Sequence, residues 1–349
     1  MARVHNGRGL AAAVLTVAAL ALGACSGAGS SSSPGASSGT TAAPADTSTT
    51  AAALDSAYTT VVKSVGPSVV LIQTASGLGS GEVYDTKGDI VTNAHVVGTE
   101  TTFTVTFEDG RQMPGTLVGS FPPDDIAVVK VNGSGLKPVS WGDSSKLQVG
   151  QPALAIGNPL GLTGSVTAGV VSALGRVVSE GSGGGTLPDA IQTSAPINPG
   201  NSGGALVDLN SQVIGIPTLA AVSRGTQGAP APGIGFAISS NRARLIANQL
   251  VKDGKVTNSH RAYMGIQAGN TVGGKGVLVA SVEPGGPAAS AGIAAGDVIV
   301  SVNGQPTPDT STLSETLASL NPGQSVPVAI IRPDGGTGTV NVRLGELPG

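Results

Sequence analysis

The chain has 349 residues, which is too long for one ordinary domain and suits two. Its 18 basic and 21 acidic residues leave a net charge of -3, and only 2% of its residues are aromatic, which argues against nucleic acid as a partner. The 54 glycines, 23 prolines and several β-branched runs are typical of short strands joined by tight turns, and they predict a mainly β protein.

Residues 1–25 are organised like a bacterial signal peptide. Arg3 and Arg8 precede an apolar stretch at 10–22, and the string Leu-Gly-Ala-Cys that follows resembles a lipobox, which predicts lipid attachment at Cys25. An ordinary secretory cleavage site and a short membrane anchor are the alternatives, although roughly 20 apolar residues are needed to span a bilayer. Cys25 is the one cysteine of the sequence, so no intrachain disulfide can form.

Residues 26–53 consist of Ser, Thr, Ala, Gly and Pro apart from Asp46. Such a segment buries too little apolar surface to offset the entropy of ordering it, which predicts a disordered tether. We expect the folded part to begin near Leu54, with a short amphipathic stretch up to Val65.

Strand-like, β-branched runs separated by turn residues then predict a domain of short strands over 54–254, namely Ser68–Gln73, Gly81–Tyr84, Asp89–Thr92, Thr102–Phe107, Ile126–Val131 and Val213–Ile216. One long helix is predicted over Ser240–Val251, with Ser240 as the N-cap and Gly254 just past its end. Polar residues 255–260 are the predicted linker to a second domain at 261–349.

Three segments carry a chemical pattern: Thr-Asn-Ala-His-Val-Val ending at 97, Asp-Ile-Ala-Val-Val beginning at Asp125, and Asn-Pro-Gly-Asn-Ser-Gly-Gly ending at 204. A serine hydroxyl needs an imidazole to take its proton and a carboxylate to orient that imidazole. His95, Asp125 and Ser202 supply one of each, in the chain order of the chymotrypsin-type double barrel. Each segment alone has a simpler interpretation, as a glycine-rich loop, a structural histidine or a solvated turn. Their coincidence in order favours a catalytic site.

The glycines around Ser202 suit an oxyanion hole, because its backbone N–H groups need conformations that side chains obstruct. Gly200 and Ser202 are the predicted donors. No metal-ligand spacing appears, and we expect neither a metal nor another cofactor.

These motifs resemble the HtrA/Deg family of envelope serine proteases, in which a barrel with TNAHV, DLAV-like and GNSGG segments precedes a PDZ domain. The resemblance extends from Leu54 to the C-terminus. It implies a chymotrypsin-like double β-barrel, the triad roles given above and an S1 wall at Ile234, Gly235 and Phe236. It also implies unfolded or misfolded envelope proteins as substrates, an extracytoplasmic location and a homotrimer.

Three positions depart from the family pattern or from more distant relatives. Ser194 stands where many family members have an acid, and Pro196 is a rigid residue before the serine loop, so the family's pocket shape and loop ordering are not carried over to this chain, whereas the triad is. Asn201 stands where digestive relatives place an aspartate that pairs with a freed N-terminus. An amide cannot form that ion pair, which argues against activation by propeptide cleavage.

The segment after His260 has a separate function. Tyr263, Met264, Gly265 and Ile266 resemble the PDZ loop whose backbone N–H groups hold a peptide carboxylate, while the next strand pairs with the peptide. Pro287 is predicted to open a short helix between strands over Gly276–Val282 and Gly296–Asn303. Leu313, Leu317 and Leu320 recur at helical spacing, and we expect the first two to belong to the core.

The sequence therefore predicts a serine endopeptidase that works through an acyl-enzyme and is regulated by a C-terminal PDZ domain binding peptide C-termini. A peptide-binding envelope chaperone, or a pseudoprotease with little proteolysis, is the alternative. The presence of all three triad members favours the enzyme.

Overall fold

The structure is a computed structural model that describes residues 47–75, 77–158, 164–179, 186–198, 200–222, 230–271 and 275–349. The predicted signal peptide with Cys25, and the predicted tether as far as residue 46, lie outside the described residues. No helix in the described ranges is long and apolar enough to cross a membrane.

Helix α1 (Thr47–Val65) corrects the predicted end of the tether, because residues 47–53 are helical. Three consecutive alanines at 51–53 are strong helix formers. They extend a helix that is held at its other end, where Val61 and Val65 are buried in one hydrophobic cluster with residues of β8 (Pro152–Gly157) and β11 (Ala205–Val207). Packing at one end thus supports turns whose composition alone suggested disorder.

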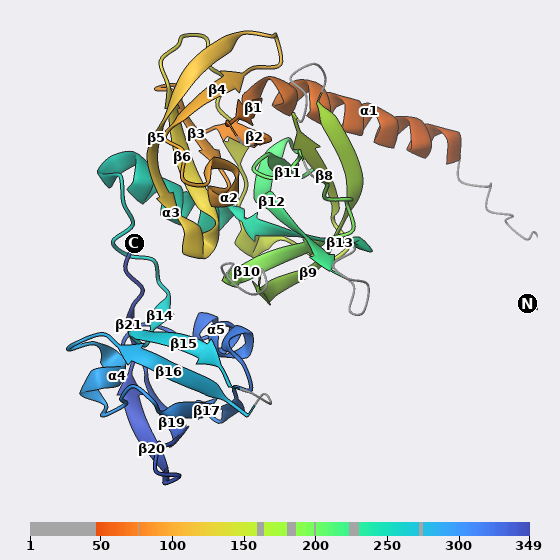
Figure 1. Cartoon of the computed structure of the whole chain (residues 1–349). Coiled ribbons are helices and arrows are strands. Elements are labelled where there is room, and N and C mark those ends of the chain that lie inside the picture. The colour runs from red at the N-terminus through yellow and green to blue at the C-terminus, as the bar shows by residue number, and fades with distance from the viewer. Residues whose placement is uncertain are drawn as a thin grey trace, which may run out of the picture. The chain divides into compact units, whose positions relative to one another are not determined.

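The first barrel is a closed antiparallel sheet in the order β1-β2-β3-β6-β5-β4, and Figure 1 shows it beside α1. Its interior is filled by alternating apolar residues such as Val70, Ile72 and Ile90, all fully buried. The strands are β1 (Val69–Gln73), β2 (Leu78–Val83), β3 (Asp89–Thr92), β4 (Thr102–Thr106), β5 (Gln112–Phe121) and β6 (Ile126–Val131).

The second barrel runs in the order β11-β8-β9-β10-β13-β12 and closes through the pairing of β11 with β12. The short strand β7 (Ser140–Trp141) adds to β12 in parallel. Its other strands are β9 (Ser165–Ser179), β10 (Thr186–Thr193), β12 (Gln212–Val222) and β13 (Pro230–Ser239). The prediction of a mainly β, double-barrel fold is confirmed.

Helix α3 (Ser240–Asp253) joins the two barrels through a shared hydrophobic cluster. Its Ala243, Ile246 and Leu250 are buried against residues of both barrels, including Phe121 and Ile216. The N-cap is Ser239 rather than the predicted Ser240, whose hydroxyl instead donates to the carbonyl of Gly142. Gly254 ends the helix with φ of 68°, as predicted.

The predicted linker at 255–260 packs against the rest of the protein. Val256 is 3% exposed and belongs to the cluster that α3 shares with the barrels, and the Ser259 side chain is buried and donates to the carbonyl of Leu347. Val256 and Ser259 are therefore buried although the polar composition of the segment predicted a linker.

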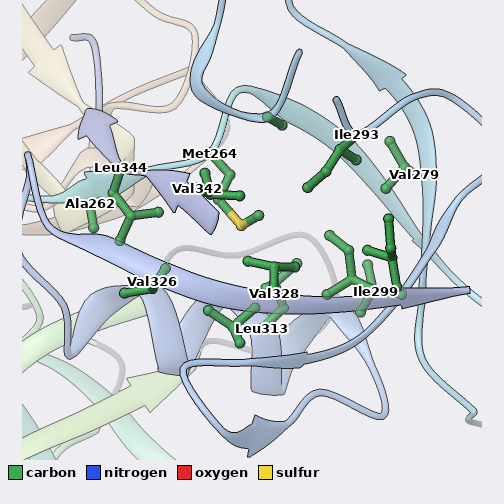
Figure 2. Close-up of a cluster of buried hydrophobic side chains, with 14 of the residues drawn as sticks. Ala262, Met264, Val279, Ile293, Ile299, Leu313, Val326, Val328, Val342 and Leu344 are labelled. Carbon is green, nitrogen blue, oxygen red and sulfur yellow. The ribbon is translucent and has the colours of Figure 1, made fainter. Parts of the chain in front are cut away.

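The C-terminal domain is a sheet in the order β15-β16-β17-β19-β20 with two short helices. Figure 2 shows its core, where Met264, Leu313, Val328 and Val342 point toward one another. Its elements are β14 (Ala262–Tyr263), β15 (Ile266–Asn270), β16 (Val277–Val282), α4 (Pro287–Ser290), β17 (Val298–Val302), β18 (Gln305–Pro306), α5 (Thr310–Ala318), β19 (Ser325–Ile331), β20 (Thr337–Arg343) and β21 (Gly345–Glu346).

Candidate active site

His95 and Asp125 form a close pair. His95 lies in the short helix α2 (Ala94–Val97) directly after β3, and Asp125 lies just before β6, the strand that pairs with β3. Nδ1 of His95 is 2.8 Å from Oδ2 of Asp125, and the backbone N–H of His95 donates to Oδ1 over 2.9 Å. The Asp125 side chain is 2% exposed while that of His95 is 45% exposed. A buried carboxylate thus orients a ring that substrate can reach.

Asp125 itself is held by further contacts and a special backbone conformation. Its φ of 53° is left-handed, a region in which aspartate is enriched and which often marks functional sites. The side-chain amide of Asn93 donates to its carbonyl over 3.0 Å, and the Thr218 hydroxyl donates to Oδ2 over 2.5 Å. These contacts fix the direction of the carboxylate.

Ser202 is brought to this pair through Thr218. The half-buried Ser202 follows β10 in the chain and precedes β11, and its hydroxyl donates to the carbonyl of Thr218 over 3.2 Å. Since the Thr218 hydroxyl contacts Asp125, one residue of β12 touches two members of the predicted triad. Ser202 is therefore connected through Thr218 to Asp125, the carboxylate that contacts His95.

The backbone of the serine loop depends on glycine at two positions. Gly200 has φ of 111° and Gly203 has φ of 79°, conformations that L side chains rarely adopt. A Cβ at Gly203 would lie 2.3 Å from the carbonyl oxygen of Ser80, which shows how closely the loop packs on β2. The positive φ of Gly200 fits the predicted oxyanion donor, which stays a prediction.

Asn201 stabilises the same loop from within. Its Oδ1 accepts from the N–H of Asn198 over 3.0 Å, and its Nδ2 donates to the carbonyl of Pro196 over 3.2 Å. Asn201 is 2% exposed. The amide therefore bonds to its own loop, in keeping with a loop that needs no ion pair with a new N-terminus.

The predicted S1 wall lies on β13, beside β10. Gly235 pairs with Thr193 and Phe236 with Gln192, and Ile234 is 37% exposed. Close by, the Ser194 hydroxyl accepts from the N–H of Val170 over 3.0 Å, so this departure from the family pattern bonds to β9.

Two buried carboxyl groups lie near the site without belonging to the triad. Asp124 is fully buried, and its Oδ2 lies 2.5 Å from Nη2 of Arg242 while its Oδ1 lies 2.9 Å from Nη1 of Arg261. Burial raises the pKa of Asp124, and the two guanidinium groups oppose that rise. Burial also raises the pKa of Glu82 well above its ordinary value. Neither of its carboxyl oxygens has a hydrogen-bond partner among the described residues.

The C-terminal domain has its own groove of roughly 280 Å³ between β15 and α5. Gly265 has φ of 71°, and the buried side chain of Met264 anchors the loop to the core. Leu313 is 3% exposed, as expected of a core residue, and it lines the groove as well. The lining includes all four predicted loop residues, Tyr263, Met264, Gly265 and Ile266, together with Leu313 and Leu317.

The double barrel with its His–Asp–Ser cluster is the architecture of a trypsin-like serine protease, followed by a peptide-binding module. Comparison with known families agrees: the trypsin-like peptidase domain matches residues 79–216 and the PDZ domain matches residues 232–344. The latter range begins before the predicted boundary and includes α3, which packs against the barrels.

Individual proteins are similar over most of this chain. It is 44% identical over 307 residues to the serine protease PepD of Mycobacterium tuberculosis, covering 82% of this chain and 65% of that protein. It is 39% identical over 269 residues to the periplasmic pH-dependent serine endoprotease DegQ of Escherichia coli, covering 74% and 58%. The chain thus spans between half and two thirds of the length of these relatives.

Solved structures match this chain over nearly their whole length. The serine endoprotease from Yersinia pestis has a TM-score of 0.57 and 35% identity, covering 83% of this chain and 98% of that one. The HtrA-type protease AlgW with decapeptide has a TM-score of 0.58 and 30% identity, covering 84% and 99%. The chain belongs to the HtrA/Deg family of serine proteases.

Several residues at the site were not predicted from the sequence. Asn93 stands inside the histidine motif, directly before the short helix that carries His95. Thr218 and Ser80 lie in ordinary strand patterns far from the motifs in sequence, and only tertiary pairing brings them to the loop.

Proposed function

We propose that this chain is an extracytoplasmic serine endopeptidase in which Ser202 is the nucleophile, His95 the general base and Asp125 the residue that orients it. The observation that carries the proposal is the pair of contacts made by Thr218, which tie the Ser202 hydroxyl to the carboxylate that holds His95. Family membership and the names of the relatives support the same activity.

In this proposal the Ser202 hydroxyl turns from Thr218 toward Nε2 of His95 when substrate binds. His95 takes the proton as Oγ attacks the scissile carbonyl carbon, and the imidazolium, stabilised by Asp125, then protonates the departing amine. Water hydrolyses the resulting acyl-enzyme in the reverse sense, with His95 again as base. The N–H groups of Gly200 and Ser202 would receive the negative charge on the carbonyl oxygen. Ile234, Gly235 and Phe236 would form the S1 wall.

The C-terminal domain would bind peptide C-termini. The N–H groups of Met264, Gly265 and Ile266 would hold the terminal carboxylate, while Leu313 and Leu317 supply an apolar wall for the last side chain. A structure of the relative AlgW has been solved with a decapeptide, which supports peptide recognition in the family.

Substrates would be unfolded or misfolded envelope polypeptides, and the relatives named periplasmic support an extracytoplasmic site of action. Cys25 would carry the lipid that anchors the chain to the membrane. Replacing it in Cys25→Ala should release the protein from the membrane fraction and abolish lipid labelling. Labelling at the wild-type level would contradict the anchor.

A homotrimer would use exposed apolar residues of α1 and of the second barrel. Leu54 on α1 is 44% exposed, and Val166 and Val170 on β9 are 38% and 37% exposed. Sedimentation of the full chain tests this, because a monomer at micromolar concentration would contradict the assembly.

Cleavage of casein tests the activity. The wild-type chain should degrade it, Ser202→Ala should not, and the thermal stability of the two should agree because a loop hydroxyl contributes little to packing. Ser134→Ala, at an exposed serine remote from the site, is the matched control. If the wild-type chain binds casein without cleaving it, the peptide-binding chaperone is the better account.

A further inference from the structure

Ser80 lies on β2 of the first barrel, is fully buried and takes no part in the proton transfers proposed above. It nevertheless contacts the serine loop on both sides of the nucleophile. Its hydroxyl donates to the carbonyl of Gly200 over 2.5 Å, and its backbone N–H donates to the carbonyl of Ser202 over 2.9 Å. One residue therefore holds two carbonyl groups of the loop.

These two carbonyls enclose a third peptide group. The carbonyl of Gly200 belongs to the peptide plane that joins it to Asn201, and the carbonyl of Ser202 belongs to the plane that joins it to Gly203. Between them lies the plane that carries the N–H of Ser202, one of the two proposed oxyanion donors. With both neighbours fixed, this N–H can turn only by changing ψ of Asn201 and φ of Ser202, and the side chains of these two residues restrict those angles.

The Ser80 hydroxyl is itself held in place. Its oxygen accepts from the N–H of Asn158, which follows β8 of the second barrel, over 2.8 Å. The Ser80 carbonyl accepts from the Thr92 hydroxyl over 2.6 Å. The hydroxyl thus donates once and accepts once, and it links both barrels to the loop.

The serine loop also packs closely against both barrels. A Cβ at Gly157 would lie 2.4 Å from Cα of Asn201, and one at Gly203 would lie 2.3 Å from the Ser80 carbonyl. The loop is therefore pressed between β2 and the end of β8 without intervening side chains at these points. Loss of the Ser80 hydroxyl would leave the Gly200 carbonyl and the Asn158 N–H buried without that partner.

We propose that Ser80 is a positioning residue for the oxyanion hole: its hydroxyl fixes the Gly200 carbonyl and so holds the loop with the N–H groups of Gly200 and Ser202 directed at the substrate's carbonyl oxygen. This inference rests on the proposed function. It adds that the geometry of the hole is set by a side chain of the first barrel.

The test is Ser80→Ala in the full chain, assayed with a fluorogenic peptide and with a peptide boronic acid that forms a tetrahedral adduct on Ser202. We expect kcat to fall about tenfold to hundredfold, with KM changed less than about twofold, because the hole acts on the transition state. Affinity for the boronic acid should fall by the same factor as kcat/KM.

Ser240→Ala is the matched control. Ser240 is also fully buried and its hydroxyl also donates to a backbone carbonyl, that of Gly142 over 2.9 Å, away from the site. It should lose comparable stability and keep its kcat and its affinity for the boronic acid. Equal kcat in Ser80→Ala and the wild type, or equal losses in the two variants, would overturn the inference.

Ser80→Cys provides the test if Ser80→Ala does not fold. Sulfur is larger and a weaker donor than oxygen, so kcat and boronic-acid affinity should again fall together. Wild-type values in a folded Ser80→Cys would overturn the inference while leaving the proposed function intact. A wild-type chain that neither cleaves the peptide nor forms the adduct would overturn both.

Discussion

The hydroxyl of Thr218 donates a hydrogen bond of 2.5 Å to Oδ2 of Asp125, the same oxygen that lies 2.8 Å from Nδ1 of His95. Thr218 is 4% exposed, and its carbonyl accepts from the Ser202 hydroxyl. A single strand residue thus supports the orienting carboxylate and holds the nucleophile beside it.

Thr218→Val keeps the shape of the side chain and removes this donor. We expect kcat to fall about tenfold, which corresponds to ~1.4 kcal/mol of transition-state stabilisation, with KM nearly unchanged. Steady-state kinetics on a fluorogenic peptide measure it. Thr307→Val, at a fully buried threonine of the C-terminal domain, should leave kcat unchanged. An unaltered kcat in Thr218→Val would remove Thr218 from the account.

The same substitution at the neighbours Asp124 and Asp125 should reduce stability at the first and kcat at the second. Asp124→Asn leaves two arginines, each 10% exposed, without their buried counter-charge, and should cost about 3 kcal/mol of unfolding free energy. Asp125→Asn should instead cut kcat by roughly 10⁴ through the wrong imidazole tautomer, with binding intact. Urea denaturation and kinetics on both variants separate the roles. A large loss of kcat in Asp124→Asn, with kcat unchanged in Asp125→Asn, would contradict the role of Asp125.

Glu82 should make the fold less stable as pH rises. Burial raises its pKa in the folded state, so the folded protein binds a proton more tightly than the unfolded chain does. Its contribution is fully present below the unfolded pKa of about 4.3 and is lost as pH rises toward the raised value. Glu82→Gln should therefore gain stability relative to the wild type as the pH rises above about 4.3. Glu108→Gln, at an exposed site, should show no such gain. The melting temperatures of the variants and the wild type, measured at several pH values, test this. A difference between Glu82→Gln and the wild type that stays the same at every pH would refute the expectation.

The C-terminal groove should require a free peptide carboxylate. In the Ser202→Ala background, which prevents cleavage, amidating an apolar-ended peptide should weaken binding about tenfold or more, because charge-assisted hydrogen bonds to the loop are lost. Gly265→Ala should weaken the free peptide similarly, since φ is 71° there and a Cβ would lie 3.2 Å from Glu283 and Pro287. Gly338→Ala, on β20 outside the groove lining and where a Cβ meets nothing within 4 Å, is the control. Calorimetric titration that gives equal affinity for acid and amide would rule out carboxylate capture.

The sequence predicted the strands and the site segments because both are local signals. Short runs of apolar, mostly β-branched residues mark β1 and β3, and His95, Asp125 and Ser202 stand in short motifs whose chain order is informative. Helix α1 was underestimated because its first turns gain their stability from packing at Val61 and Val65, which composition does not reveal.

The supporting contacts could not be predicted in the same way. Ser80 and Gly200 are 120 positions apart, and Asp125 and Thr218 are 93 apart, so each hydrogen bond depends on the closure of two barrels. Glu82 lies on β2 and is fully buried, and within the part of the chain that the structure describes its carboxyl oxygens have no hydrogen-bond partner, which the strand pattern alone does not reveal.

Mass spectrometry of the full chain after reaction with a fluorophosphonate tests the central claim most directly. The phosphorus–fluorine bond is replaced by a bond to the activated hydroxyl, so one adduct should appear, on the peptide that contains Ser202. It should be absent from Ser202→Ala and form much more slowly in Asp125→Asn. An adduct at another residue, or an unmodified wild-type chain, would contradict Ser202 as the nucleophile.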